Sequence, residues 1–269
     1  MSIRATVRVT GAAKNTVTKL LVDLGEACAE FQDGEFQNLD LRHIECDEIW
    51  SFCYAKQKNV PEEFQDTPGY GDVWTWTAID ADSKLVPSWL VGERTTEDCY
   101  VFLRDLKSRL LPGQRIQHSA DGFGSYPPVV DALWRDGIDF AQIIKEYDSP
   151  SEGEARKYSP AKNCRVTDIN VLNGDPDPAH ISTSYVERQN LTMRMGMRRF
   201  TRLTNGFSKK VENLAHAVSL HYMHYNFGRT HQSLTIVDDY GYKTKQTPAM
   251  AAGIADHPWS LTQIAGLLD

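Results

Sequence analysis

The spacing of apolar residues constrains this fold most, because it changes repeatedly between the period of a strand and that of a helix. Apolar and polar residues alternate in HIECDEIWSFCY, and again in DVWTWTAIDADSKLVPSWLVG, which we interpret as a hairpin turning at Asp80–Lys84. A helix, a strand, a helix and a strand then follow in TTEDCYVFLRDLKSRLL, QRIQHSAD, SYPPVVDALWRDG and IDFAQII. Two more helices are expected over 184–203 and 208–227. This order predicts an α/β fold, a mixed sheet with helices on both faces.

The segments outside this pattern suggest how the chain is divided. SIRATVRV and TGAAKNTVTKLL have the pattern of the last two helices of a helix-turn-helix, although any short helical hairpin looks the same. The chain starts within that motif, so we expect its first helix to be missing. The expected divisions are a partial helix-turn-helix over 1–29, a linker over 30–41, a main domain over 42–228 with an insertion over 148–182, and a tail over 229–269.

Composition limits the class of protein. Of the 269 residues, 41% are hydrophobic and 24% are charged, as in ordinary globular proteins. No apolar run reaches the roughly 18 residues of a membrane span, and the N-terminus lacks the apolar core of a signal peptide. The five cysteines form no C-x-x-C pair, which disfavours a zinc ribbon or a disulfide framework and favours a reducing cytoplasm. We expect all five to be small buried hydrophobic residues.

Charge is distributed unevenly although the net charge is −7. Residues 1–21 hold four Lys or Arg, residues 188–210 hold seven, and neither stretch contains an acid. The acids are concentrated between these stretches. Two basic patches could bind a polyanion if the intervening acids hold metal ions or face away from it.

Three carboxylates lie on separate predicted elements: Asp47 in the first strand, Asp121 at the end of a later strand and Glu187 near the start of a helix. Each has a simpler explanation. Asp47 lies among other acids of what could be an edge strand, Asp121 precedes a glycine and suits a turn, and Glu187 completes an S-x-x-E capping box with Ser184. Together, however, they match a two-metal phosphoryl-transfer site, in which hard oxygen ligands from separate elements converge.

The helix expected over 184–203 has a distinctive charged face. On a helical wheel Glu187 lies within about 80° of Arg194, Arg198 and Arg202, while the apolar residues lie on another side. One acid followed by a row of arginines suits a metal ligand whose neighbours hold phosphates. Gly196 weakens the helix locally and permits a kink there.

Three segments carry a resemblance to a known family, namely IECDEIWSF, SADGFGSY and YVERQNLTMRMGMRRFTRLTNGFSKKVEN. They resemble the DDE transposases of bacterial insertion sequences, which belong to the RNase H-like integrase superfamily. YNFGRTHQSL, followed by TPAMAAG, is similar to the Tyr–Asn–Arg–His segment common after the catalytic glutamate in that family. The resemblance covers roughly residues 42–253, and the block around Glu187 is its most specific part. Many relatives also carry a zinc-binding module and a full helix-turn-helix, and neither is complete here.

The resemblance implies an RNase H-like fold and an enzyme that cleaves DNA at element ends and transfers the strand into target DNA. It makes Asp47, Asp121 and Glu187 the catalytic and metal-binding residues, with two Mg²⁺ ions that Mn²⁺ can replace. The residues expected to contact DNA are Arg188, Arg194, Arg198, Arg202, Lys209, Lys210, Lys14 and Lys19. Asn190, Arg229 and His231 are expected to support the site. The implied partner is double-stranded DNA, bound by a homo-oligomer in the cytoplasm at the nucleoid, without a membrane or an organic cofactor.

Other functions stay open. One is an RNase H-like nuclease that cuts without joining, and another is a catalytically silent DNA-binding protein derived from a transposase. An unrelated metabolic α/β enzyme is disfavoured, because the sequence has neither a glycine-rich phosphate loop nor a nucleophile elbow. Trp74 and Trp76 could form a base-stacking platform, but alternation within a strand favours core packing.

Overall fold

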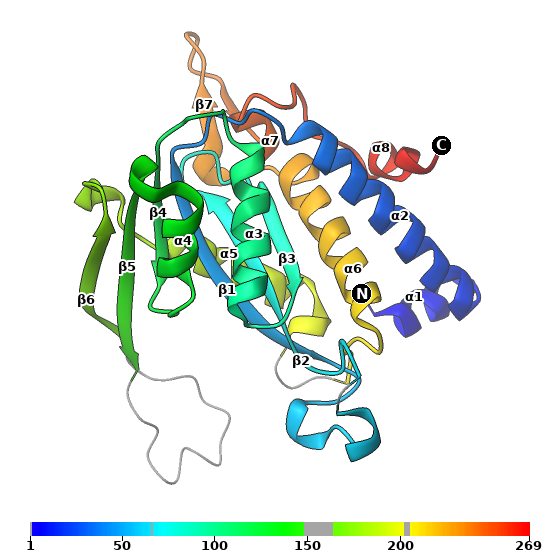
Figure 1. Ribbon diagram of the computed structural model, residues 1–269. Coiled ribbons are helices and arrows are strands. Elements are labelled where there is room, and N and C mark those ends of the chain that lie inside the picture. Colours follow the sequence, from blue (N-terminus) through cyan, green and yellow to red (C-terminus); the bar gives the residue numbers. More distant parts are fainter. Residues whose placement is uncertain (1, 66, 148–163, 202–204) are drawn as a thin grey trace.

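The computed structural model describes residues 2–65, 67–147, 164–201 and 205–269. Its centre is a six-stranded sheet in the order β3-β2-β1-β4-β5-β6 (Figure 1). The strands are β1 (His43–Cys53), β2 (Gly71–Asp80), β3 (Ser88–Gly92), β4 (Ile116–Asp121), β5 (Ile138–Tyr147) and β6 (Cys164–Asn173). β4 is parallel to β1 and β5, and the other neighbours are antiparallel. The predicted mixed α/β sheet is confirmed, and it is compatible with an RNase H-like fold.

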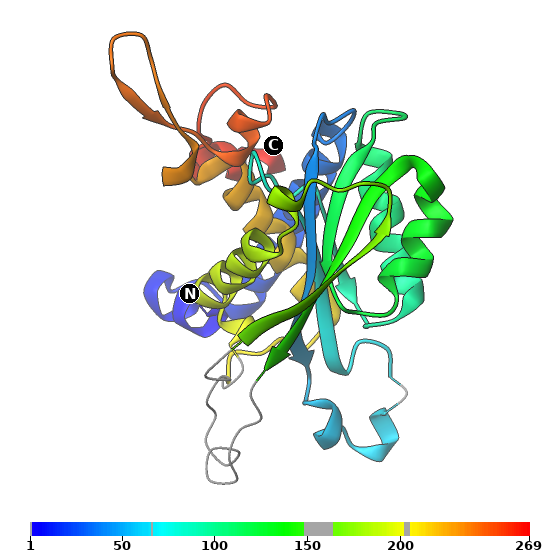
Figure 2. The ribbon, with the colours of Figure 1, turned by 90° about the vertical axis from the view of Figure 1, so that its left-hand side faces the viewer.

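Helices cover both faces of the sheet, which Figure 2 shows edge-on. One face carries α3 (Thr96–Arg109) and α4 (Tyr126–Trp134), and the other carries α5 (Ser184–Gly196) and α6 (Val211–Met223). The β-like stretch expected within the insertion is the outer strand β6, which extends the main sheet. Residues 148–163 of that insertion lie outside the described residues.

Alternation along the strands divides the hydrophobic core between the two faces. In β2, Trp76 and Ala78 pack with residues of α3 and α4, whereas Val73 and Ile79 pack with residues of α5 and α6. Trp76 is fully buried, so it is the core residue that alternation favours. The same alternation in β1 places Ile44 and Cys46 with residues of α3 and α4, and Ile49 and Cys53 with residues of α5 and α6.

Two helices, α1 (Ile3–Thr10) and α2 (Lys14–Glu35), form the expected N-terminal pair. Gly11 ends α1 in the left-handed conformation (φ 72°), which glycine adopts without strain. α2 is much longer than expected, so the prediction of a linker over 30–41 is wrong as far as Glu35. Polar composition misled here because Gln32 is fully buried, with its side-chain amide donating to the carbonyl of Cys28 (2.9 Å).

α2 packs directly along α6. The hydroxyl of Ser219 donates to the carbonyl of Gly25 (2.8 Å), and a Cβ added at Gly25 would lie 2.5 Å from the Cβ of His216. The two helices therefore touch through backbone at this point, and only glycine fits. The N-terminal pair is packed onto the main domain.

The expected tail contains short elements: β7 (Thr235–Val237), β8 (Lys243–Lys245), α7 (Pro248–Ala251) and α8 (Leu261–Ala265). A π-helical turn at His224–Gly228 connects α6 to this region. The ring of Trp259 lies 4.8 Å from that of Phe31 in α2 and 5.5 Å from that of Phe227. The C-terminal segment is thus fastened to α2 by aromatic contacts.

α5 ends earlier than the sequence predicted. The helix stops at Gly196, Met197 is extended (φ −123°, ψ 107°), and a 3-10 turn follows at Arg198–Phe200. The prediction of one continuous helix over 184–203 is therefore wrong beyond Gly196, where the weak helix propensity of glycine is decisive. The wheel that aligned Arg198 with Glu187 does not hold, and Arg202 lies outside the described residues.

The cysteines with described side chains behave as core residues. Cys28, Cys46, Cys53 and Cys99 are fully buried with free thiols, and burial raises the pKa of Cys28 to about 11. Among the described residues, no helix combines the length and the apolar character that crossing a bilayer requires.

Candidate metal centre

Asp47 and Asp121 meet because β1 and β4 are parallel neighbours. The register pairs Cys46 with Ala120, so the next residue of each strand is one of the two aspartates. β4 ends at Asp121, and ligand sites of α/β sheets lie at such carboxyl ends. Single oxygen atoms of Asp47, Glu48 and Asp121 all lie within 4.8 Å of one another. We call these three residues the acidic cluster; the structure brings two predicted carboxylates together and adds Glu48.

Two hydrogen bonds orient Asp47. Its Oδ1 accepts from the backbone N–H of Glu48 (2.9 Å), and its Oδ2 accepts from Nδ2 of Asn190 in α5 (2.8 Å). Asn190 is itself buried, and within the described part of the chain its Oδ1 has no hydrogen-bond partner. An unpaired buried acceptor beside a carboxylate is costly unless a cation or water occupies the space next to it.

Glu48 is held from the opposite face of the sheet. Its Oε1 accepts from the hydroxyl of Tyr126 (2.5 Å), its Oε2 accepts from Nε of Arg94 (3.0 Å), and its side chain is fully buried. Local pattern does not predict this role, because Glu48 is one of several acids on what could be an edge strand. β1 is instead central, and the partners of Glu48 come from 46 and 78 residues away.

Arg94 lies between the acidic cluster and two aromatic rings. Besides Glu48 it approaches Oδ2 of Asp121 (3.5 Å), and its guanidinium lies 4.2 Å from the ring of Phe123 and 4.9 Å from that of Trp74. Aromatic faces stabilise a cation and fix its plane. Asp121 also accepts from the N–H of Phe123 (3.0 Å), yet a third of its side chain stays exposed. Asp121 is therefore the carboxylate of the cluster most open to a ligand.

Glu187 lies beside the acidic cluster but is turned toward other partners. It stands one helical turn before Asn190 on α5, and its charge contributes to raising the pKa of Asp47. Its Oε1 accepts from the hydroxyl of Thr183 (2.9 Å) and forms an ion pair with Lys145 of β5. Its side chain is 47% exposed. The third predicted carboxylate is thus close enough to act on Asp47 electrostatically, while a lysine holds it.

Glu45 takes the capping role that the sequence suggested for Glu187. Its Oε2 accepts from the backbone N–H groups of Tyr185 (2.7 Å) and Val186 (3.0 Å), the first turn of α5. The hydroxyl of Ser184 instead bonds that of Ser182 (2.8 Å). A carboxylate from β1 therefore fixes the end of α5 that carries Glu187.

Burial and mutual repulsion raise the pKa values of two carboxyl groups in the acidic cluster. Burial, and then the charge of Asp121, raises the pKa of Asp47 to about 7. The same two causes, in the same order, raise the pKa of Glu48 to about 8. Without a further cation the cluster resists full ionisation at neutral pH.

The basic residues expected to contact DNA are dispersed. Arg188 and Arg194 lie on α5, and Arg188 is exposed. Lys19 forms an exposed ion pair with Asp23. Four others line one groove that includes no residue of the acidic cluster: Lys14, Arg198, Lys209 and Lys210. Four of the eight expected contacts therefore belong to a surface separate from the carboxylates.

The two remaining expected residues lie in the C-terminal region. The backbone N–H of Arg229 donates to the carbonyl of His224 (2.8 Å), and the ring of His231 packs edge-on against Tyr225 (4.9 Å). Burial lowers the pKa of His231 to about 4. Within the described chain, neither side chain forms a hydrogen bond or ion pair with the acidic cluster.

The donor set fits a hard divalent cation. Carboxylate oxygens are the preferred ligands of Mg²⁺ and Mn²⁺. The cluster and Glu187 supply four carboxylates against two cationic side chains, Arg94 and Lys145. This excess of negative charge, together with the unpartnered oxygen of Asn190, makes the cluster a candidate metal site. No protein-family model matches the chain and no curated protein matches it, so the case rests on this geometry.

Proposed function

We propose that this protein is a DDE transposase that cleaves DNA at the ends of an insertion sequence and transfers the strand into target DNA. The observation that carries the proposal is the meeting of Asp47 and Asp121 at the end of β4, beside helix α5, whose Asn190 bonds Asp47 and whose Glu187 acts electrostatically on Asp47. The sequence motifs that contain these three acids resemble that family, and a mixed sheet with this site suits phosphoryl transfer.

Asp47 and Asp121 would hold the metal, with Glu187 as the third ligand once it leaves Lys145. Mg²⁺ bound there would neutralise charge that develops on a phosphodiester under attack and favour ionisation of the attacking hydroxyl. A second ion would stabilise the leaving oxygen, and the same pair of ions would serve both successive displacements, by water and then by a 3′-hydroxyl.

The protein's own residues prepare this site. Asn190 fixes the direction of Asp47, and Glu45 fixes the start of the helix that carries Asn190 and Glu187. Arg94 offsets the charge of Glu48. Both oxygens of Glu48 already accept hydrogen bonds, one from Tyr126 and one from Arg94, so Glu48 supports the site and does not bind the metal directly. Lys145 neutralises Glu187 in the absence of metal and competes with metal for it.

The proposed partner is double-stranded DNA, bound by a homo-oligomer because two element ends must be brought together. The test is a cleavage and joining assay with Mg²⁺ or Mn²⁺ on DNA from both flanks of the gene. It compares the wild type with Asp121→Asn and with Asp131→Asn, a control at an exposed acid of α4. Joined products that disappear only in Asp121→Asn are expected.

Other outcomes would point elsewhere. Cleavage without joining would replace the transposase by a nuclease. Cleavage that survives in Asp121→Asn would reject the site, and binding without chemistry in all three proteins would favour a DNA-binding protein derived from a transposase.

A further inference from the structure

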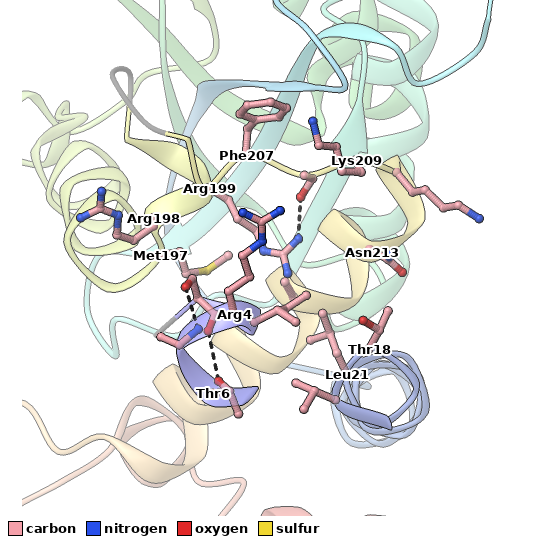
Figure 3. Close-up of a pocket in the computed structure, with 18 of the residues that line it drawn as sticks. Arg4, Thr6, Thr18, Leu21, Met197, Arg198, Arg199, Phe207, Lys209 and Asn213 are labelled. Atoms are coloured by element: carbon pink, nitrogen blue, oxygen red, sulfur yellow. Dashed lines mark hydrogen bonds between the residues drawn. The ribbon is translucent and has the colours of Figure 1, made fainter. Parts of the chain in front are cut away.

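A basic groove opens at the far end of α5 from Glu187. It has a volume of about 1600 Å³ and is lined by α1, the start of α2, residues 196–199 and residues 205–210. Figure 3 shows Arg4 of α1, Arg199 and Lys209 around the same space. From Glu187 to Gly196 the helix rises about 14 Å, so the groove is separate from the acidic cluster.

The charge of this groove is all of one sign. Eight of the lining residues are Lys or Arg and none is Asp or Glu, although the whole chain carries a net charge of −7. Arg4, Lys14, Arg198 and Lys209 are exposed. In the part of the chain that the structure describes, none of the eight forms an ion pair. Positive charges that line a groove without neighbouring acids attract an anionic ligand.

Two long helices also begin at this groove. α2 starts at Lys14 and α6 at Val211, and neither has a side-chain hydrogen bond at its N-cap. Their free backbone N–H groups and dipoles add to the positive potential. Phosphate oxygens are the anions that suit N–H groups and Arg or Lys side chains together.

An aromatic wall distinguishes the groove from a simple phosphate site. Phe207 lines it beside Phe52, with 4.8 Å between the ring centroids, and Nζ of Lys209 lies 4.0 Å from the Phe207 ring. Nζ of Lys56 also lies 5.8 Å from the centroid of the Phe52 ring. Aromatic rings set in a row of basic residues bind single strands, whose unpaired bases can stack on them, whereas the bases of a duplex are already stacked.

We propose that this groove binds a single strand of nucleic acid, with phosphates on its basic walls and a base against Phe207. The proposal goes beyond the transposase activity and does not need the metal centre. An unpaired strand bound here would lie one helix length from the acidic cluster.

The test measures fluorescence anisotropy of a labelled oligothymidylate of about ten nucleotides, and of a duplex of the same length, in EDTA. Lys56→Gln and Arg198→Gln remove charges that line the groove. Lys58→Gln and Arg104→Gln remove exposed charges outside it. We expect each groove variant to weaken single-strand binding about three- to tenfold and to lower its salt slope by about 0.7 per lost phosphate contact, with both controls unchanged.

Phe207→Leu tests the aromatic wall and is expected to weaken single-strand binding at least about fivefold without changing the salt slope. Equal losses in groove variants and controls would overturn the proposal, as would duplex binding as tight as single-strand binding. If Phe207→Leu lowers the melting temperature, Lys56→Gln and Arg198→Gln still test whether the groove binds a single strand. EDTA removes metal-dependent chemistry from the binding assay. A negative binding result therefore does not contradict the proposed transposase, and a negative cleavage result does not contradict the groove proposal.

Discussion

At the scale of single residues, two neighbours in β1 do different work because a strand alternates its side chains. Asp47 faces α5 and bonds Asn190, whereas Glu48 faces α4 and bonds Tyr126, yet both reach Asp121. This is possible only where β4 ends. The cluster therefore depends on the register of β1 and β4. Burial and the charge of Asp121 raise the pKa values of Asp47 and Glu48.

The first prediction concerns pH in metal-free protein. With pKa values of about 7 for Asp47 and about 8 for Glu48, the folded protein holds protons that the unfolded chain has already lost. These two groups alone should therefore lower the free energy of unfolding by about 2 kcal/mol as pH rises from 6.5 to 8. Urea unfolding in EDTA measures it, and Glu48→Gln should flatten the slope.

Buried histidines oppose part of this fall. Burial lowers the pKa of His118 to about 3 and those of His221 and His231 to about 4, so their effect makes stability rise with pH up to and just beyond the ordinary histidine pKa of about 6.5 and reduces the net fall to about 1 kcal/mol. Buried thiols act only above about pH 8. Wild-type stability that is constant or rising between pH 6.5 and 8 would contradict the raised pKa values. Saturating Mg²⁺ should remove the fall.

A second prediction separates the support of Glu48 from stability in general. Tyr126→Phe removes the 2.5 Å hydrogen bond to Glu48 and leaves a buried oxygen without a donor, at a cost of about 1–3 kcal/mol. Tyr222→Phe removes a hydroxyl that bonds Thr77 (2.7 Å), the β2 residue paired with Asp47, but no carboxylate of the acidic cluster. We expect both variants to lower the melting temperature, but only Tyr126→Phe to weaken Mn²⁺ binding. Equal metal affinities would show that Glu48 does not shape the site.

At the scale of elements, α5 is the part that completes the site. Its first turn is bonded by Glu45, its second turn supplies Asn190, and its end at Gly196 opens into the basic groove. One helix therefore connects the acidic cluster to the region where the basic residues gather.

The third prediction tests how Glu45 positions this helix. Glu45→Met removes the acceptor of two backbone N–H groups and should cost about 1–3 kcal/mol of unfolding free energy and weaken Mn²⁺ binding. Glu45→Gln keeps an acceptor oxygen and should lose less of both. The two variants are compared by thermal unfolding and by metal titration. If Met and Gln behave alike, the hydrogen bonds to α5 are not what matters.

At the scale of the whole molecule, the N-terminal helices are part of the main domain, because α2 lies against α6. The fourth prediction uses two glycines of α2. Gly25→Ala would place a Cβ 2.5 Å from His216 and should destabilise the protein by about 1–3 kcal/mol, whereas Gly34→Ala meets nothing within 4 Å and should stabilise it by about 0.5–1 kcal/mol. Denaturant unfolding measures both. A neutral Gly25→Ala would mean that α2 is not docked.

Much of this architecture could be predicted from local pattern. Alternation located the hairpin and β1 with Asp47 inside it, and the end of β4 located Asp121, because these signals depend on neighbouring residues only. Contacts between residues far apart in the sequence could not be predicted. Gln32 is buried against α6, so its polar side chain wrongly suggested a linker where α2 continues. No residue near Glu48 in the sequence indicates that Tyr126 bonds it. The prediction that the arginines share one face of α5 is wrong for a local reason, because the helix ends at Gly196.

The most direct test of the central claim is Mn²⁺ binding followed by electron paramagnetic resonance, without DNA. The account predicts that the wild type and Asp131→Asn bind Mn²⁺ alike, whereas Asp47→Asn and Asp121→Asn each lose most of the affinity and Glu187→Gln loses part of it. Binding that is unchanged in both Asp47→Asn and Asp121→Asn would contradict a metal centre at the end of β4, and with it the proposed chemistry.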